Sequence, residues 1–206
     1  GPLHEEIWAH ENIHQHFAVR AYPKDQSVSA LMTEGITTLL QLDYTHRALV
    51  GLERDLAMAS RLRELGLQME YRFPQVLTLP LALPDAAQLP DDPYVYNVWG
   101  YFKGASTHEL LREWVGDTAF EDALRSYLRA CDAAPCDNDV FLSSVEATSG
   151  KPMRAFFDRF VFGAARVTVR VGFEPRGLEG VDVTLEQQDA GFLPLELWVL
   201  GQEGQL

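Results

Sequence analysis

The chain has 206 residues, 47% of them hydrophobic, which is enough for one large domain or for a helical domain with part of a second. The formal net charge of −13 argues against a nucleic-acid-binding protein, because phosphate binding needs clustered Lys and Arg. No run of eighteen apolar residues occurs, and the first residues are neither basic nor continuously apolar, so we expect no membrane contact, no signal peptide and a cytoplasmic location.

The first part of the chain has the apolar spacing of helices. The predicted helices here run from Leu3 to about Arg20, from the capping sequence Asp25-Gln26-Ser27 to Asp43, and from about residue 45 to 65. Five prolines between residues 73 and 93 exclude a regular helix or a central strand, so this segment is predicted to be an ordered connector. Further helices are predicted over residues 98–115, 118–131, 137–148 and 152–162.

After Gly163 the apolar pattern changes to the period of two that is typical of strands. Three strands are predicted, over residues 167–171, 181–185 and 195–199. The sequence therefore predicts a mainly α fold with two domains, a helical region over residues 1–163 and a β-strand region over residues 164–206, the second of which looks incomplete at Leu206.

The clearest motif is His10-Glu11-Asn12-Ile13-His14, which fits the pattern HExxH. Residues four apart on a helix face the same side, so both imidazoles can reach one metal ion. Glu11 follows the first of them and can contact a water molecule on the metal without being a ligand itself. A catalytic zinc site needs such a carboxylate to take the proton of that water.

A third ligand is predicted in the sequence Thr33-Glu34-Gly35 of the second helix. Glu34 would lie on a helix next to the one that carries the two histidines. Two histidines, one glutamate and an open position are typical of a catalytic zinc site rather than a structural one. The pair Cys131 and Cys136 has the spacing C-x4-C with no second pair, which is a poor zinc site, and we interpret both cysteines as structural or incidental.

These residues resemble the aminopeptidase N family of gluzincin zinc metallopeptidases, which includes the leukotriene hydrolases. The resemblance rests on HExxH followed by Gln15 and Phe17, on Glu34-Gly35, and on Tyr101-Phe102-Lys103-Gly104-Ala105, which matches the family block Tyr-x-Lys-Gly-Ala. Two positions depart from the family: its tryptophan after the glutamine is His16 here, and nineteen residues instead of eighteen separate His14 from Glu34.

The resemblance implies Zn²⁺ bound by His10, His14 and Glu34, with Glu11 as the base. It assigns Tyr101 to stabilising the oxyanion and makes Tyr96 a candidate substrate-binding residue. The implied fold is a thermolysin-like helical catalytic subdomain, the C-terminal part of a catalytic domain, followed by a short, incomplete β-sandwich segment. The implied reaction is the removal of N-terminal residues from peptides.

The family also places a β-rich domain and the first part of the catalytic domain ahead of HExxH, including a Gly-x-Met-Glu-Asn strand whose glutamate holds the substrate amine. That part is absent from this sequence. The resemblance therefore implies a partner segment, in the same parent chain or in a complementing chain. Apolar surface exposed where that segment packs would favour a homo-oligomer, and the missing strand leaves open whether this chain is active by itself.

The sequence leaves two alternatives open. A thermolysin-type endopeptidase shares HExxH and a downstream glutamate, although Tyr101-x-Lys-Gly argues against it. A catalytically degenerate relative that serves as an interaction module would keep the zinc site for stability or lose it, and the changes at His16 and in the spacer keep this alternative open. Zinc without turnover would indicate such a module.

Overall fold

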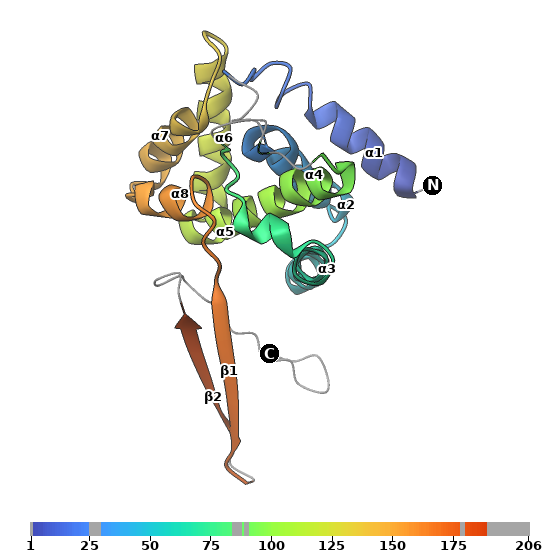
Figure 1. Ribbon diagram of the computed structural model, residues 1–206, viewed down its shortest axis with the longest axis vertical. Coiled ribbons are helices and arrows are strands. Elements are labelled where there is room, and N and C mark those ends of the chain that lie inside the picture. The colour runs from blue at the N-terminus through green and yellow to red at the C-terminus, as the bar shows by residue number, and fades with distance from the viewer. Residues whose placement is uncertain (1, 25–29, 84–87, 89–90, 178–179, 189–206) are drawn as a thin grey trace. The chain divides into compact units, whose positions relative to one another are not determined.

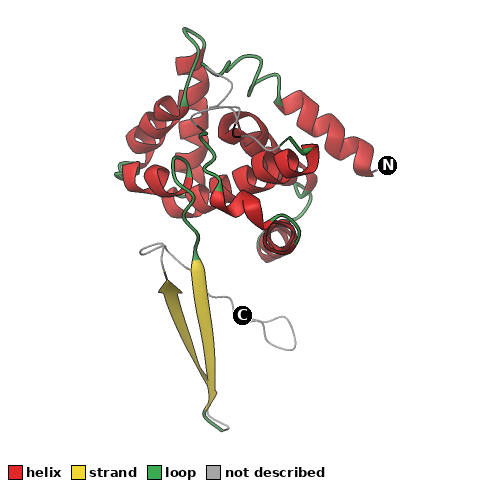
Figure 2. Cartoon of the chain, viewed as in Figure 1, coloured by secondary structure: helices red, strands yellow, loops and turns green. Residues whose placement is uncertain are grey.

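The computed structural model describes residues 2–24, 30–83, 88, 91–177 and 180–188. The chain divides into two compact units, residues 1–165 and 166–206. In the described residues the first unit is helical and the second contains two strands (Figure 2). The predicted mainly α fold class is confirmed.

The first unit is an assembly of helices, drawn in chain order from blue to orange in Figure 1. They are α1 (Pro2–Ile13), η2 (Leu31–Gly35), α2 (Ile36–Thr45), α3 (Leu52–Tyr71), η3 (Pro74–Thr78), α4 (Pro93–Asn97), η5 (Val98–Lys103), α5 (Gly104–Val115), α6 (Asp117–Cys131), α7 (Asn138–Ser149) and α8 (Arg154–Phe160). Two of them, η2 and η5, are π-helical segments that continue directly into α2 and α5. Short π-helical turns inside helices are frequent at functional sites.

Local sequence signals set several helix ends. Asp137 caps α7, because its carboxylate accepts a hydrogen bond from the backbone N–H of Val140 at 3.0 Å. Gly150 ends the same helix in the left-handed conformation, with φ of 66°. Gly116, with φ of 90°, separates α5 from α6. Both glycines lie between helices and have the positive φ that glycine accommodates without strain.

The predicted first helix is too long, because α1 ends at Ile13 rather than near Arg20. The Nδ1 atom of His14 forms a hydrogen bond with the carbonyl oxygen of Phe17 at 3.0 Å, so this oxygen is drawn into a local turn. Ala18 then takes a positive φ of 124°, which no helix accommodates. The third helix is displaced as well, since α3 starts after Gly51 and continues to Tyr71.

The proline-rich connector is tied to η5 by side-chain hydrogen bonds to backbone oxygens. The Trp99 indole donates to the carbonyl of Pro80 at 3.0 Å. The Lys103 ammonium donates to the carbonyl of Val76 at 3.1 Å and also to that of Leu79. Burial lowers the pKa of Lys103 to about 8. The connector therefore fixes η5 from one side.

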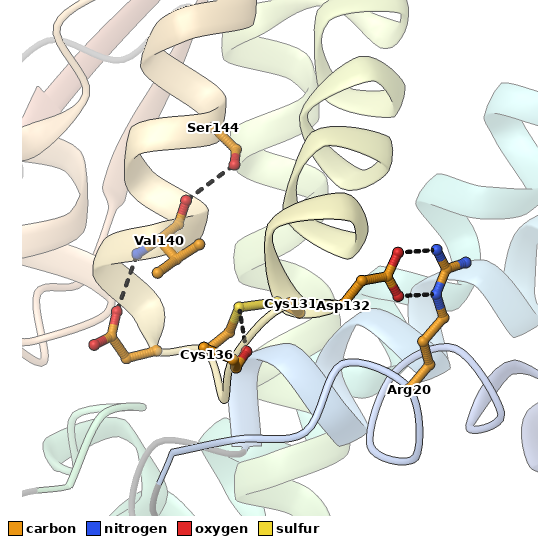
Figure 3. The surroundings of a disulfide bond; sticks show 8 residues. Arg20, Cys131, Asp132, Cys136, Val140 and Ser144 are labelled. Carbon is orange, nitrogen blue, oxygen red and sulfur yellow. Dashed lines mark hydrogen bonds and ion pairs between the residues drawn. A yellow bond between two sulfur atoms is a disulfide. The ribbon is translucent and has the colours of Figure 1, made fainter.

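A disulfide joins Cys131 at the end of α6 to Cys136 (Figure 3). The loop that it closes holds the segment following α1, because the backbone N–H of Cys136 donates to Tyr22 and its carbonyl accepts from Lys24, at 2.9 and 2.8 Å. Beside it, Arg20 makes two hydrogen bonds of 2.6 Å to the Asp132 carboxylate (Figure 3). The sequence did not predict this pairing. Disulfides are rare in the cytosol, and the cytoplasmic location stays a prediction.

The second unit contains an antiparallel pair of strands, β1 (Thr168–Pro175) and β2 (Val181–Gln188). Two of the predicted strands lie largely within them, and the third, at residues 195–199, falls outside the described residues. The start of a β-sandwich therefore stays a prediction, as do the predicted domain limits. Among the described residues, no helix has the length and apolar character needed to cross a membrane.

The core on the α5–α7 side is aromatic and includes one fully buried histidine. His108 packs edge-on against Phe120 and Phe141, with ring centroids 6.0 and 5.5 Å away, and its Nε2 atom donates to the carbonyl of Leu31 at 2.8 Å. Burial lowers the pKa of His108 to about 4, and the positive charge of Arg112 adds to this effect. The imidazole is therefore neutral in the folded protein at neutral pH.

This burial predicts a pH-dependent stability. The pKa of His108 is lower in the folded protein than the ordinary 6.5 of an unfolded chain, so the unfolded state binds more protons between pH 6.5 and 4. We expect the free energy of unfolding to fall as the pH is lowered through this window, and His108→Gln to remove on the order of 3 kcal/mol of that fall. Urea unfolding at several pH values measures it. A His108→Gln slope equal to that of the exposed-site control His4→Gln would contradict the prediction.

Candidate metal centre

Three side chains from neighbouring helices converge beside α1. His10 lies on the last turn of α1, His14 follows that helix directly, and Glu34 lies on η2. The two Nε2 atoms are 3.1 Å apart, and Glu34 Oε2 is 3.4 Å from that of His10 and 3.3 Å from that of His14. Donor atoms 2.0–2.1 Å from a tetrahedral zinc ion lie about 3.3 Å from one another. The three atoms therefore match three corners of such a site.

The tautomers of both histidines suit a metal ligand. His10 Nδ1 lies 2.9 Å from the side-chain oxygen of Gln41, and His14 Nδ1 lies 3.0 Å from the carbonyl oxygen of Phe17. Because both of these partners are acceptors, each Nδ1 atom carries the hydrogen and each Nε2 atom presents a lone pair. Two lone pairs then face each other across 3.1 Å, an arrangement that a cation between them stabilises.

Glu34 supplies the negative charge. Burial by itself would raise its pKa, but the contacts with His10 and His14, together with Tyr101, lower it to about 2, so the group is ionised at neutral pH. Its Oε2 atom is buried and lacks a hydrogen bond of good geometry. Buried anionic oxygens of this kind are normally paired or bound to a metal. The donor set therefore fits a divalent cation, and it is the group of His, Cys, Asp and Glu that the described residues bring within metal-binding distance.

Tyr101 lies against the same centre. Its ring stacks on that of His10, with centroids 5.3 Å apart and an interplanar angle of 2°, and its hydroxyl lies close enough to Glu34 for the two groups to shift each other's pKa. Burial and the charge of Glu34 raise the pKa of Tyr101, so its phenol stays protonated and can donate. Tyr96 is half-buried, and burial followed by the charge of Glu34 raises its pKa too. Both predicted tyrosines are thus within electrostatic range of Glu34.

Glu11 differs from the three converging residues because its side chain is exposed. It lines a cavity of about 310 Å³ together with His10 and Tyr101, and the cavity extends between α1, α2 and α3 to apolar residues such as Leu42 and Leu65. Glu11 therefore borders a space next to the candidate metal position, where a substrate or a water molecule can enter.

Sequence reasoning missed Gln41, which orients His10. A signal was present, because Gln41 follows Glu34 by seven residues and positions two turns apart share one face of a helix. The sequence does not distinguish this amide from other glutamines on helices, because only the position of His10 gives it a role.

A sequence model of the peptidase family M1 domain matches residues 3–160. The chain belongs to peptidase family M1. This confirms the family predicted from the motifs. Membership implies Zn²⁺ as the cofactor, and His10, His14 and Glu34 are positioned to bind it.

Solved structures of M1 zinc metallopeptidases share the fold. The M1 zinc metallopeptidase from Deinococcus radiodurans, also solved as an E323A mutant bound to a Tyr-Ser-Ala substrate, is 20% identical with a TM-score of 0.60, and the match covers 76% of this chain. Legionella pneumophila aminopeptidase A, solved with aspartic acid, is 17% identical with a TM-score of 0.53 over 88% of this chain. The chain spans only 32% and 19% of these two proteins. Among curated proteins, none matches the sequence.

The support of His10 by Gln41 predicts a test of metal binding. Gln41→Met keeps the length of the side chain but removes the acceptor of the Nδ1 hydrogen, so the imidazole can rotate or change tautomer. We expect zinc affinity to fall about 10–100-fold, measured by competition with a chromogenic chelator. The matched control is Gln68→Met on α3, and equal affinities of the two variants would contradict the prediction.

Proposed function

We propose that the chain forms the zinc-binding and catalytic part of a metallopeptidase, most specifically an aminopeptidase that removes N-terminal residues from peptides. The observation that carries the proposal is the convergence of His10, His14 and Glu34, whose three donor atoms lie 3.1–3.4 Å from one another. The membership of family M1 supports the peptidase class. The aminopeptidase assignment is supported by the name of the Legionella neighbour and by the tripeptide bound to the Deinococcus one.

The chemistry divides between the metal and the chain. Zinc held by the three ligands supplies a Lewis acid for the scissile carbonyl and lowers the pKa of a water molecule. Glu11 lines the adjoining cavity without joining the three ligand atoms, so its carboxylate is free to take the proton of the attacking water and to return it to the leaving amine.

Tyr101 stabilises the negative charge that develops on the substrate oxygen. Its protonated phenol stacks on the His10 ring beside Glu34, so its hydroxyl is available to donate to the oxyanion that would develop during attack. A donor that is already in place needs no reorganisation when that charge appears. Tyr96, on the preceding helix α4, is proposed as a substrate-binding residue.

Replacement of Glu11 tests the base. Glu11→Gln keeps the shape of the side chain but cannot accept a proton, so we expect the hydrolysis of aminoacyl-arylamides by the full-length protein to fall about 10²–10⁴-fold. Zinc content measured on the same sample is expected to stay unchanged. Glu5→Gln, on the same helix, is the matched control. A Glu11→Gln activity within tenfold of the wild type would remove Glu11 as the base.

Replacement of Tyr101 tests the oxyanion donor. Tyr101→Phe keeps the ring stacked on His10 and removes only the hydroxyl. We expect kcat to fall about 10²–10³-fold with little change in KM, measured by steady-state kinetics. Tyr94→Phe removes an exposed hydroxyl from α4 and serves as the control. A change in KM alone would assign Tyr101 to ground-state binding instead.

Two further measurements separate the alternatives. An aminopeptidase hydrolyses a peptide with a free amine and not the same peptide after N-acetylation, whereas a thermolysin-type endopeptidase tolerates the acetyl group. Stoichiometric zinc without any hydrolysis by the full-length protein would instead indicate an interaction module.

A further inference from the structure

Two glycines lie where the elements that carry the site approach each other. Gly35 follows Glu34 at the end of η2, and Gly104 begins α5 three residues after Tyr101. Their backbone angles are ordinary helical ones, with φ and ψ of −63° and −53° at Gly35 and of −60° and −50° at Gly104. Alanine adopts this conformation more readily than glycine. The local backbone therefore does not explain why glycine stands at either position.

The explanation is contact between the two backbones. A Cβ atom added to Gly35 would lie 2.7 Å from the Cα atom of Gly104, and one added to Gly104 would lie 2.6 Å from the Cα atom of Gly35. The carbonyl oxygen of Ala30 is close to both added atoms, at 3.2 and 3.4 Å. All of these neighbours are backbone atoms, so no side chain can turn away to make room. A methyl group at either glycine must push the two segments apart.

We infer that Gly35 and Gly104 are positioning residues that set the distance between the metal ligand Glu34 and the oxyanion donor Tyr101. The inference rests on the proposed function for the role of Tyr101. Gly35 lies in η2 together with Glu34, and Gly104 directly follows η5, which carries Tyr101. A displacement of one backbone from the other therefore moves Glu34 relative to Tyr101 and to α1. The nearby Gly100 also faces Glu34, but an added Cβ atom there would lie 3.7 Å from Glu34 Cβ, which is ordinary contact.

The size of the displacement decides whether the metal–ligand distances would change beyond their tolerance. Ordinary contact begins at 3.4 Å, so a Cβ atom 2.6 Å from backbone requires a shift of about 0.8 Å. Metal–ligand distances tolerate about 0.2 Å. A shift of that size is larger than this tolerance. Unless His10 and His14 move with Glu34, the three ligand atoms can then no longer all lie at bonding distance from one ion.

The experiment compares alanine substitutions at four glycines. Gly35→Ala and Gly104→Ala introduce the clash, Gly100→Ala introduces a methyl group that fits, and Gly66→Ala places one on α3 with nothing within 4 Å. Zinc affinity is measured by chelator competition, and far-UV circular dichroism monitors the fold. We expect Gly35→Ala and Gly104→Ala to retain the helical signal and to lose zinc affinity by about tenfold or more, with Gly66→Ala and Gly100→Ala within about threefold of the wild type.

Each outcome decides the inference. Folded Gly35→Ala and Gly104→Ala proteins with the affinity of Gly66→Ala would overturn it, and so would the loss of the helical signal in both, because the contact would then serve the fold and not the site. If the wild type binds no zinc, the proposed function fails as well; if it binds zinc and all four variants bind equally, only the present inference fails. Kinetics of the full-length protein add a second readout, in which Gly104→Ala is expected to lower kcat more than it changes KM.

Discussion

The site depends on the repulsion among three electron-rich groups that point at one position. Two imidazole lone pairs and one carboxylate oxygen face one another at 3.1–3.4 Å, and the carboxylate oxygen is buried without a good hydrogen bond. A set of electron-rich atoms at this spacing is unfavourable unless a proton or a cation lies among them. In the chain by itself the contact with Glu34 raises the pKa of His14, although burial opposes the shift. The remaining structure has to hold these groups together against their mutual repulsion.

Much of the site could be predicted from the sequence because its signal is local. The i, i+4 spacing of His10 and His14 already places two imidazoles on one side of a helix, and Tyr101 with Lys103-Gly104 forms a contiguous block. The structure brings Glu34 to the histidines despite the longer spacer, and the described residues 14–24 after α1 are turns and bridges rather than helix, which can absorb one residue. The helical class followed from periodicity in the same way.

Other features could not be read from the sequence because they depend on side-chain and backbone contacts that the apolar spacing does not show, some of them local and some between distant segments. The end of α1 at Ile13 follows from a hydrogen bond between the His14 side chain and the Phe17 carbonyl, which competes with the helix that the apolar spacing favours. The Cys131–Cys136 disulfide closes a loop whose backbone pairs with the segment after α1, over one hundred residues earlier. No pattern within either segment indicates the other.

Helix α5 explains how one element can serve both the metal ligand and the catalytic tyrosine. Its first residue, Gly104, contacts the backbone of η2 at Gly35, and one turn later His108 donates a hydrogen bond to the carbonyl of Leu31 at 2.8 Å. That carbonyl also accepts from the N–H of Ile36, five residues on, which is the bond that makes η2 a π-helical turn. The helix thus holds η2 at both of its ends, while η5, its direct continuation toward the N-terminus, carries Tyr101. His108 is neutral, so its N–H can stay buried in the aromatic core and donate to the Leu31 carbonyl. The position of Glu34 is therefore supported by a residue outside the three metal ligands.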